Sequence, residues 1–408
     1  MESEVRSRIG ERLIAYWKKE TVQVIAAVLA ILSCFLVPPS AEYLAYINYK
    51  VLILLFCLMS VVAGMKQIGV FDALCSSLLQ RVHSVRGLML LLSVLSFFLS
   101  MFLTNDVTLV TVVPFTIMVF GKRDSRNLIM TLILETVATN LGSMFTPFGN
   151  PQNLFLYAAY EFDFVAFLTL MLPYTLLSLL LVIAACLILG GNQKMAENRD
   201  DRKAGQRSKS LEDGQNVRAQ DAAKSFSEIF EYKTNRLKFG VYLLLFALSI
   251  LAVARVLDIR ILLALTLLGI GVMDWKLFRQ VDYALLLTFV FFFVFVGNMG
   301  KVEWVSEFLR HQVAGRELPV AILASQMISN VPAAVLLEQF TDVGSRLVVG
   351  VNLGGLGTLI ASMASLITYK FYAGMQDSHK GKYLLFFTVV NLVFLVVLCG
   401  MAKINGIL

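Results

Sequence analysis

The chain has 408 residues, 58% of them hydrophobic, a mean hydropathy of +0.75 and a net charge of +7. Apolar runs such as 51–64, 164–189 and 383–401 approach or reach the roughly 20 residues that cross a hydrocarbon core. No polar face interrupts these runs at helical spacing, which excludes a soluble domain. The composition therefore predicts an all-α polytopic membrane protein.

The positive charge is a topology signal and does not indicate a nucleic-acid ligand. Most of the 35 lysines and arginines fall in polar segments that would share one side of the membrane with a cytosolic N-terminus at 1–20. This bias is the one that the positive-inside rule expects. We therefore predict a multi-pass protein of the cytoplasmic (inner) membrane, surrounded by lipid, with its N-terminus inside and its C-terminus outside.

The first half, residues 21–190, is predicted from its apolar runs and the polar breaks between them. Two full spans and an amphipathic helix come first, followed by a broken run, an interrupted span and a last full span. In chain order these elements cover 21–37, 49–65, 70–79, 87–120, 128–159 and 165–190.

The broken run 87–120 contains the polar break Thr104-Asn105-Asp106. Two full spans around this break would leave the neighbouring basic residues on the same side, so charge alone does not decide. The second arm, 107–120, is short for a crossing. We therefore predict a re-entrant hairpin, whose unwound tip at membrane depth is tolerated only inside protein or beside a cavity.

The interrupted span 128–159 carries Pro147, Gly149 and Pro151. The two prolines remove helical hydrogen bonds, which predicts a helix broken at membrane depth. A simple kink is the alternative for this segment alone.

A polar segment at 191–236 is predicted to be a cytosolic linker, and the second half, 237–408, follows it. One extra span at 237–254 inverts that half relative to the first, which gives nine crossings and two re-entrant hairpins. Hairpin 318–341 and broken helix 346–370 correspond to 87–120 and 128–159. The remaining elements are two spans, an amphipathic helix and a last span, at 259–273, 283–300, 302–309 and 383–402.

A repeated motif supports the duplication. Residues 140–146 recur as 352–358, with Asn-Leu-Gly and a threonine at matching places, and the register holds downstream, where Asn150 aligns with Ser362. Paired interruptions at corresponding places in two halves are the best sequence pointer to the binding site of a secondary transporter.

Unwound tips expose backbone carbonyls to a cation, and the half-helices that follow them offer amides to an anion. Asparagine, serine and threonine add neutral polar groups without the desolvation cost of full charges. The candidate substrate and ion ligands are therefore the residues of the tips and breaks: Thr104, Asn105, Asp106, Glu135, Asn140, Thr146, Pro147, Gly149, Asn150, Gln152, Asn153, Ser329, Asn330, Val331, Gly357, Thr358, Ser362 and Ser365.

Two of these residues are carboxylates inside the predicted membrane region. Asp106 lies at the first tip, and Glu135 lies about two turns into its span with Thr139 and Gly142 on the same face. Either residue could bind Na⁺ or carry a proton. The alternatives are a helix N-cap for Asp106 and a structural hydrogen bond for Glu135.

The sequence shows no catalytic constellation. The five cysteines have no metal-binding spacing, and the three histidines fall in predicted loops or interfacial helices. We therefore expect no enzymatic activity and no cofactor apart from a coupling ion, Na⁺ or H⁺.

These tips and breaks resemble those of the ion transporter superfamily, which includes arsenite permeases, NhaD-type antiporters, citrate transporters and divalent-anion:sodium symporters. The resemblance covers 45–402 and is strongest to the bacterial arsenite-permease-like anion transporters. Three motifs carry it: residues 104–106, 149–154 and 329–333.

The resemblance implies two scaffold-and-transport units with substrate between them, a homodimer and elevator movement. It also implies Na⁺ at Asn105, Asp106 and Asn150, and at Asn330 and Ser362. The tips of the dicarboxylate relatives read Ser-Asn-Thr, whereas here the first ends in Asp106 and the second in Val331. This departure leaves carboxylate specificity and two-sodium stoichiometry open.

We therefore predict an ion-coupled (Na⁺ or H⁺) secondary transporter of a small anion. A Na⁺/H⁺ antiporter and an arsenite or oxyanion efflux permease are the alternatives.

Overall fold

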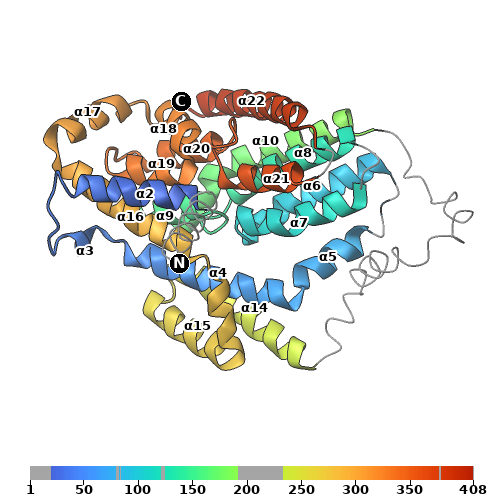
Figure 1. The fold of residues 1–408 in the computed structure, drawn as a ribbon, viewed down its shortest axis with the longest axis horizontal. Helices are drawn as coiled ribbons and strands as arrows, with labels where there is room; N and C mark the ends of the chain where they lie inside the picture. The colour runs from blue at the N-terminus through green and yellow to red at the C-terminus, as the bar shows by residue number, and fades with distance from the viewer. Residues whose placement is uncertain are drawn as a thin grey trace, which may run out of the picture.

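The described residues of the first half form nine helices, and the described part of the protein is nearly all helical, which confirms the all-α prediction (Figure 1). The computed structural model describes residues 20–79, 82, 84–120, 125–191, 233–375 and 378–407. The predicted linker lies outside the described residues except at its two ends. The helices of the first half are α2 (Thr21–Ser33), α3 (Tyr43–Tyr46), α4 (Tyr49–Ile68), α5 (Val70–Leu79), α6 (Val85–Phe102), α7 (Asn105–Phe120), α8 (Ser125–Ser143), α9 (Pro151–Ala159) and α10 (Phe164–Leu189).

The second half repeats this order after one additional helix. Its elements are α14 (Lys233–Val253), α15 (Ile259–Asp274), the 3₁₀ helix η1 (Trp275–Gln280), α16 (Tyr283–Lys301), α17 (Glu303–Val313), α18 (Glu317–Ile328), α19 (Asn330–Glu338), α20 (Gly344–Gly354), α21 (Met363–Ala373) and α22 (Lys380–Ile404).

Seven of the described helices are long and apolar enough to cross a membrane, which confirms the polytopic class. They include α6, which the sequence assigned to a hairpin, whereas the predicted first span contains only the 13-residue α2. The number of crossings therefore stays a prediction. The arms of the second hairpin, α18 and α19, have 12 and 9 residues, so they rise only about 18 and 14 Å.

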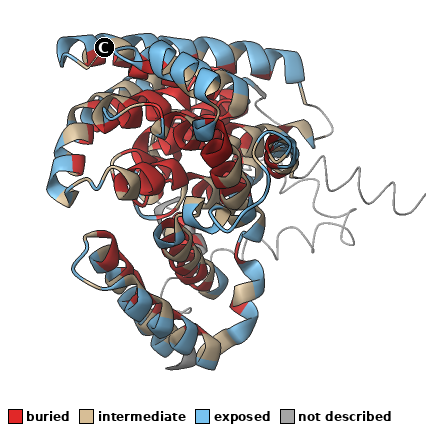
Figure 2. Cartoon of the chain, turned by 90° about the vertical axis from the view of Figure 1, so that its left-hand side faces the viewer, coloured by how far each residue is buried: buried red, intermediate tan, exposed pale blue. Residues whose placement is uncertain are grey.

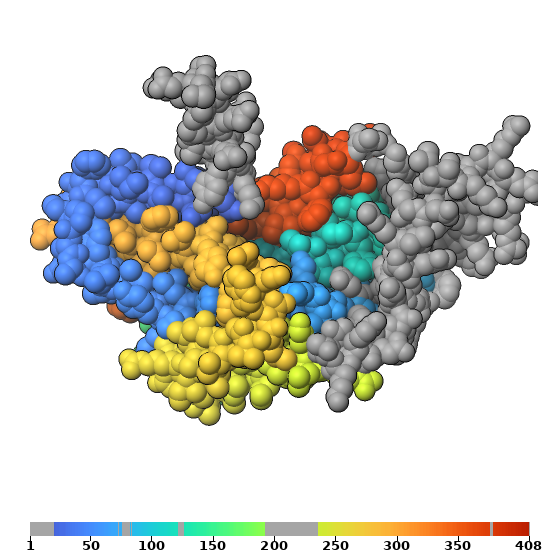
Figure 3. All heavy atoms as spheres, turned by 60° about the horizontal axis from the view of Figure 1, so that its bottom comes forward, coloured from blue at the N-terminus to red at the C-terminus, as the bar shows by residue number. Residues whose placement is uncertain are grey.

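The helices form two groups. The first, which we call the hairpin bundle, contains the pairs α6–α7 and α18–α19 and the broken helices α8–α9 and α20–α21. The second, which we call the frame, contains α2, α4, α14, α15 and α16, where α2 packs on α16 and α4 packs on α14 and α15. The helices α14 and α15 project from the face shown in Figure 3.

The hairpin bundle is interlocked across the two halves. Each hairpin packs on the first segment of the broken helix in its own half, α6 on α8 and α18 on α20. Each also packs on the second segment of the other half's broken helix, α7 on α21 and α19 on α9. The two breaks therefore meet at the centre of the bundle.

Burial follows this arrangement. Figure 2 shows the buried residues concentrated in the middle of the molecule, with mostly exposed helices above and below. Large apolar side chains such as Leu180, Val272 and Val396 are exposed on the outer helices α10, α15 and α22. Such an apolar exterior suits contact with lipid, because a water-exposed surface rarely carries so many apolar side chains.

Candidate functional site

The glycine and threonine that both copies of the motif share dock each hairpin on its broken helix. In the first half, a Cβ atom at Gly142 would lie only 2.1 Å from the carbonyl oxygen of Phe97, so only glycine allows α6 and α8 to approach this closely. Four residues later, Thr146 Oγ1 donates a hydrogen bond to the Met101 carbonyl at 2.6 Å. This bond satisfies a carbonyl left open at the end of the α6 arm.

The second copy repeats these contacts. A Cβ atom at Gly354 would lie 2.5 Å from Ser325 Oγ on α18, and Thr358 Oγ1 donates to the Gln326 carbonyl at 3.4 Å. The Gln326 side chain adds hydrogen bonds from its Nε2 to the carbonyls of Gly354 and Leu356, each 2.8 Å long. Its Oε1 accepts from the Thr358 amide at 2.8 Å. The glycine and threonine of the motif are therefore assembly residues in both halves.

The asparagine of the motif links the two halves reciprocally. Asn140 Oδ1, on α8, accepts hydrogen bonds from Ser362 Oγ at 2.9 Å and from Asn105 Nδ2 at 3.4 Å. Asn352 Oδ1, on α20, accepts from Asn150 Nδ2 at 3.1 Å. Ser362 and Asn150 precede α21 and α9, so each motif asparagine binds the start of the other half's second segment.

The surroundings of Asn140 and Asn352 differ in how many of their polar atoms are hydrogen-bonded. Asn352 Nδ2 donates to Asn153 Oδ1 at 2.6 Å and to the Val348 carbonyl at 2.8 Å, so its amide is fully used. Asn140 is only 5% exposed, yet its Nδ2 has no partner among the described residues. Ser365 Oγ, one turn after Ser362 and fully buried, also has none. Buried polar atoms of this kind are costly unless a ligand, ion or water satisfies them.

We call the residues around Asn140 the tip-one group: Asn105, Asn140, Ser362 and Ser365. It differs from the sodium ligand sets that the resemblance implied, because Ser362 is bonded here to first-half residues and Asn150 is bonded to Asn352. Those sodium assignments stay predictions. The start of α7 beside this group is ordered by Asn105 Oδ1, which accepts from the Asp106 amide at 3.0 Å.

A cavity of about 250 Å³ adjoins the first tip, between the hairpin bundle and the frame helices α4 and α16. Thr104 and Asp106 line it from the tip, and Asp282 and Lys66 line it from the frame. Asp106 Oδ1 has no hydrogen-bond partner among the described residues. The tip therefore places an acidic residue in the wall of a space that can hold a small solute or ion.

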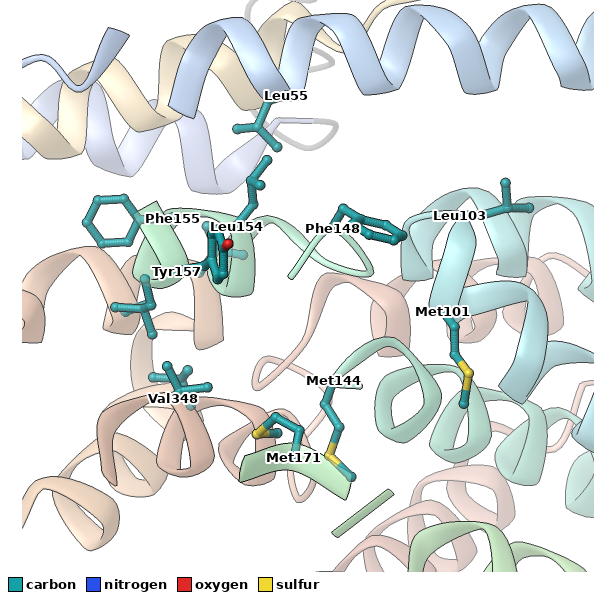
Figure 4. Packing of buried hydrophobic residues seen from close by; sticks show 14 of the residues in the cluster. Leu55, Met101, Leu103, Met144, Phe148, Leu154, Phe155, Tyr157, Met171 and Val348 are labelled. Carbon is teal, nitrogen blue, oxygen red and sulfur yellow. The ribbon is translucent and has the colours of Figure 1, made fainter. Parts of the chain in front are cut away.

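The break between α8 and α9 forms the wall of this cavity. Figure 4 shows Phe148 in that loop, with Met101 and Leu103 of the first hairpin on one side and Leu154 and Phe155 of α9 on the other. The turn is tight, since a Cβ atom at Gly149 would lie 2.2 Å from the Ser143 carbonyl oxygen.

The rest of the loop is held by hydrogen bonds and burial. Asn153 Nδ2 donates to the Met144 and Thr146 carbonyls at 3.0 and 3.1 Å. Pro147 lies within the loop itself, and Gln152, in the first turn of α9, is buried with its Oε1 unpartnered among the described residues.

The second tip is built differently. Ser329 has a φ of +74°, an unusual value for a residue with a side chain, and the Asn330 amide donates to the Ala361 carbonyl at 3.0 Å. Val331 lines a small cavity of about 90 Å³ against α2 and α16. In the facing break, Gly357 has a φ of +117°, which favours glycine.

Glu135 lies away from both tips. It is fully buried on α8, where Thr116 Oγ1 of α7 donates to its Oε1, while its Oε2 has no partner among the described residues. The sequence placed Glu135 on a face with Thr139, and both residues are indeed buried.

Sequence reasoning missed Gln326 and Ser143. Ser143 Oγ accepts from Asn150 Nδ2 at 3.2 Å, and Gln326 holds the second break. Neither residue matches the other half in type, so no repeat pattern could have identified them.

Known proteins that are similar to this chain include membrane transporters. The family model described as citrate transporter matches residues 13–340. A transporter of Methanocaldococcus jannaschii is 29% identical over 372 residues, which cover 89% of this chain and 92% of that protein. The Escherichia coli inner membrane protein YbiR is 30% identical over 339 residues, 80% of each chain. A silicon efflux transporter of rice is 31% identical over 172 residues, 42% of this chain and 35% of the relative.

Proposed function

The chain belongs to the citrate transporter family, and from this membership and the geometry of the site we propose that it is an ion-coupled secondary transporter of a small anion. The observation that carries the proposal is the tip-one group. It combines a hairpin tip with both broken helices and leaves buried amide and hydroxyl groups without partners among the described residues. Buried polar groups of this kind suit a bound ion and its co-substrate.

Na⁺ is the cation that the tip-one group would suit. Asn105, Ser362 and Ser365 supply neutral side-chain oxygens, and Asp106 adds a carboxylate beside the adjoining cavity. Hard cations prefer oxygen ligands of this type. The amide Nδ2 of Asn140 and the N-terminal turn of α21 are donors, so they would face the anionic substrate.

Cavities at both ends of α4 support alternating access. The cavity beside the first tip reaches Lys66, near the C-terminal end of α4, whereas a cavity of about 860 Å³ reaches Tyr49 and Lys50 at its N-terminal end. Both lie between the frame and the hairpin bundle, and apolar contacts such as Leu55 with Leu154 pack the seam between them (Figure 4). Movement of the bundle along the frame, in a homodimer, would open one cavity as it closes the other.

A Na⁺/H⁺ antiporter is the second candidate. The observation that favours it is the presence of two carboxylates, Asp106 and Glu135, that each have an oxygen unpartnered among the described residues. An antiporter needs an acidic group that exchanges a proton for Na⁺, and it needs no organic anion.

Reconstituted protein in lipid vesicles separates these functions. Radiolabelled citrate, as the anion that gives the family its name, and arsenite are offered with Na⁺ and proton gradients imposed separately. The proposal expects anion flux that rises with one of the gradients. A Na⁺-driven change of internal pH without any anion would identify the antiporter instead. Flux that ignores both gradients would contradict ion coupling.

A further inference from the structure

Buried polar side chains follow one another along α8 from the tip-one group to Glu135, and two of them are hydrogen-bonded to α21. At one end Ser362 Oγ donates to Asn140 Oδ1 at 2.9 Å, and farther along Thr136 Oγ1 donates to Thr368 Oγ1 at 2.9 Å. The two helices are therefore antiparallel in register here. We call this set the polar column: Glu135, Thr136, Thr139 and Asn140 of α8, and Ser362, Ser365 and Thr368 at α21.

The middle of the polar column holds two hydroxyls without partners. Thr139 lies one turn after Thr136 on α8, and Ser365 lies one turn before Thr368 on α21. Both side chains are fully buried, and neither hydroxyl has a hydrogen-bond partner among the described residues. Each hydroxyl can donate and accept, so hydroxyls without a fixed partner can pass a proton by reorientation, with or without an intervening water.

Glu135 lies at one end of the polar column, in surroundings that disfavour its charged form. It is fully buried, it takes part in no ion pair of the described residues, and one carboxyl oxygen, Oε2, has no partner among them. Thr116 Oγ1 donates to the other oxygen. A buried carboxylate with no cationic partner is strongly disfavoured by its loss of hydration, whereas the neutral acid avoids this cost.

The described elements packed around Glu135 supply no compensating positive charge. The titratable groups that interact with it electrostatically are the Tyr383 hydroxyl of α22 and the Cys186 thiol of α10. Lys370 of α21 is exposed and lines the cavity beside the second tip, and the lysines of α22, Lys380, Lys382 and Lys403, are exposed as well. On α6 and α20, Arg86 and Arg346 lie within the first three residues of their helices, and Asp106 lies at the start of α7.

We propose that Glu135 is a proton-binding site, separate from the hairpin tips, and that the polar column carries its proton to and from the cavity beside the first tip. A proton that arrives from water in the cavity converts the carboxylate to the neutral acid, and the reverse step returns it. Proton binding rests on the packing described above. The use of this proton to drive transport rests on the proposed function.

Infrared spectroscopy of the purified full-length protein tests the proton site without any substrate. Wild type at neutral pH should show the carbonyl stretch of a protonated carboxyl group that disappears in Glu135→Gln. The matched control is Glu338→Gln, since Glu338 is a partly buried carboxyl at the far end of α19, and here the band should persist. A spectrum unchanged by Glu135→Gln would overturn the assignment.

Deuterium exchange of the same band tests the column and does not require the Glu135 variant to fold. Thr139→Val removes one of the unpartnered hydroxyls of the polar column and should slow the exchange by about tenfold, equivalent to about 1.4 kcal/mol on the barrier. Thr175→Val is the control, because its buried hydroxyl bonds to the Met171 carbonyl of its own helix. Equal exchange in Thr139→Val and wild type would exclude the column as the route.

Vesicle flux separates this inference from the proposed function. If Glu135 carries the coupling proton, Glu135→Gln loses the response of anion flux to a proton gradient and keeps the response to Na⁺. A variant that keeps the full proton response would refute the role of Glu135 while leaving coupled transport intact. Wild-type flux that ignores both gradients would refute coupled transport, and the infrared result would still decide the proton site.

Discussion

At the residue scale, the residues of the repeated motif at 140–146 and 352–358 have two different structural roles. Its glycine and threonine dock the hairpins, through Gly142 and Thr146 in the first half, whereas its asparagine links the halves, through Asn140 and Ser362. From the sequence, this motif predicted a duplication and candidate ligands, but no docking role. The close approach of α6 to α8 depends on tertiary packing, which no spacing along the chain reveals.

Replacement of Gly142 by alanine tests the docking role. The new Cβ would meet the backbone carbonyl of Phe97, which cannot rotate away, so the free energy of unfolding should fall by about 1–3 kcal/mol. The measurement is thermal unfolding of the purified protein in detergent. Gly400→Ala on α22 is the control, since its added Cβ meets no neighbouring atom within 4 Å and its unfolding temperature should not fall.

At the element scale, the breaks in the two interrupted spans were predictable because prolines, glycines and clustered polar residues disfavour a continuous helix within an apolar run. The observed breaks, between α8 and α9 and between α20 and α21, fall inside the predicted interrupted spans. The interlock of α7 with α21 and of α19 with α9 was not predictable. It depends on the relative orientation of the two halves, which the pattern of apolar and polar residues does not specify.

Replacement of Gln326 by leucine should loosen the second break alone. The change removes bonds to the Gly354 and Leu356 carbonyls and to the Thr358 amide, so amides in 355–362 should exchange hydrogen for deuterium faster. Mass spectrometry of peptic peptides measures this exchange, and the corresponding loop 144–150 serves as an internal control. Equal protection in both proteins would show that Gln326 does not hold the break.

At the scale of the whole molecule, the two halves resemble each other in helices but differ in chemistry. The side-chain amide of Asn352 is fully hydrogen-bonded. The tip-one group and the polar column, in contrast, retain polar atoms without partners among the described residues. This difference supports the proposal of a single cation site in the first tip region, whereas the family resemblance implied two sodium ligand sets. The membrane class and family were readable from composition and motifs, but the asymmetry arises from contacts between distant residues such as Asn140 and Ser362.

Sodium binding to the purified protein tests the single cation site most directly. Equilibrium binding of radioactive Na⁺ is measured on wild type, Asn140→Ala and Asn391→Ala, the last a buried asparagine that bonds to its own helix. We predict saturable binding to wild type and Asn391→Ala, with a loss of at least about tenfold in affinity in Asn140→Ala, or about 1.4 kcal/mol, because the truncation disrupts the tip-one group. Unchanged binding in Asn140→Ala, or none in wild type, would contradict the assignment of the sodium site.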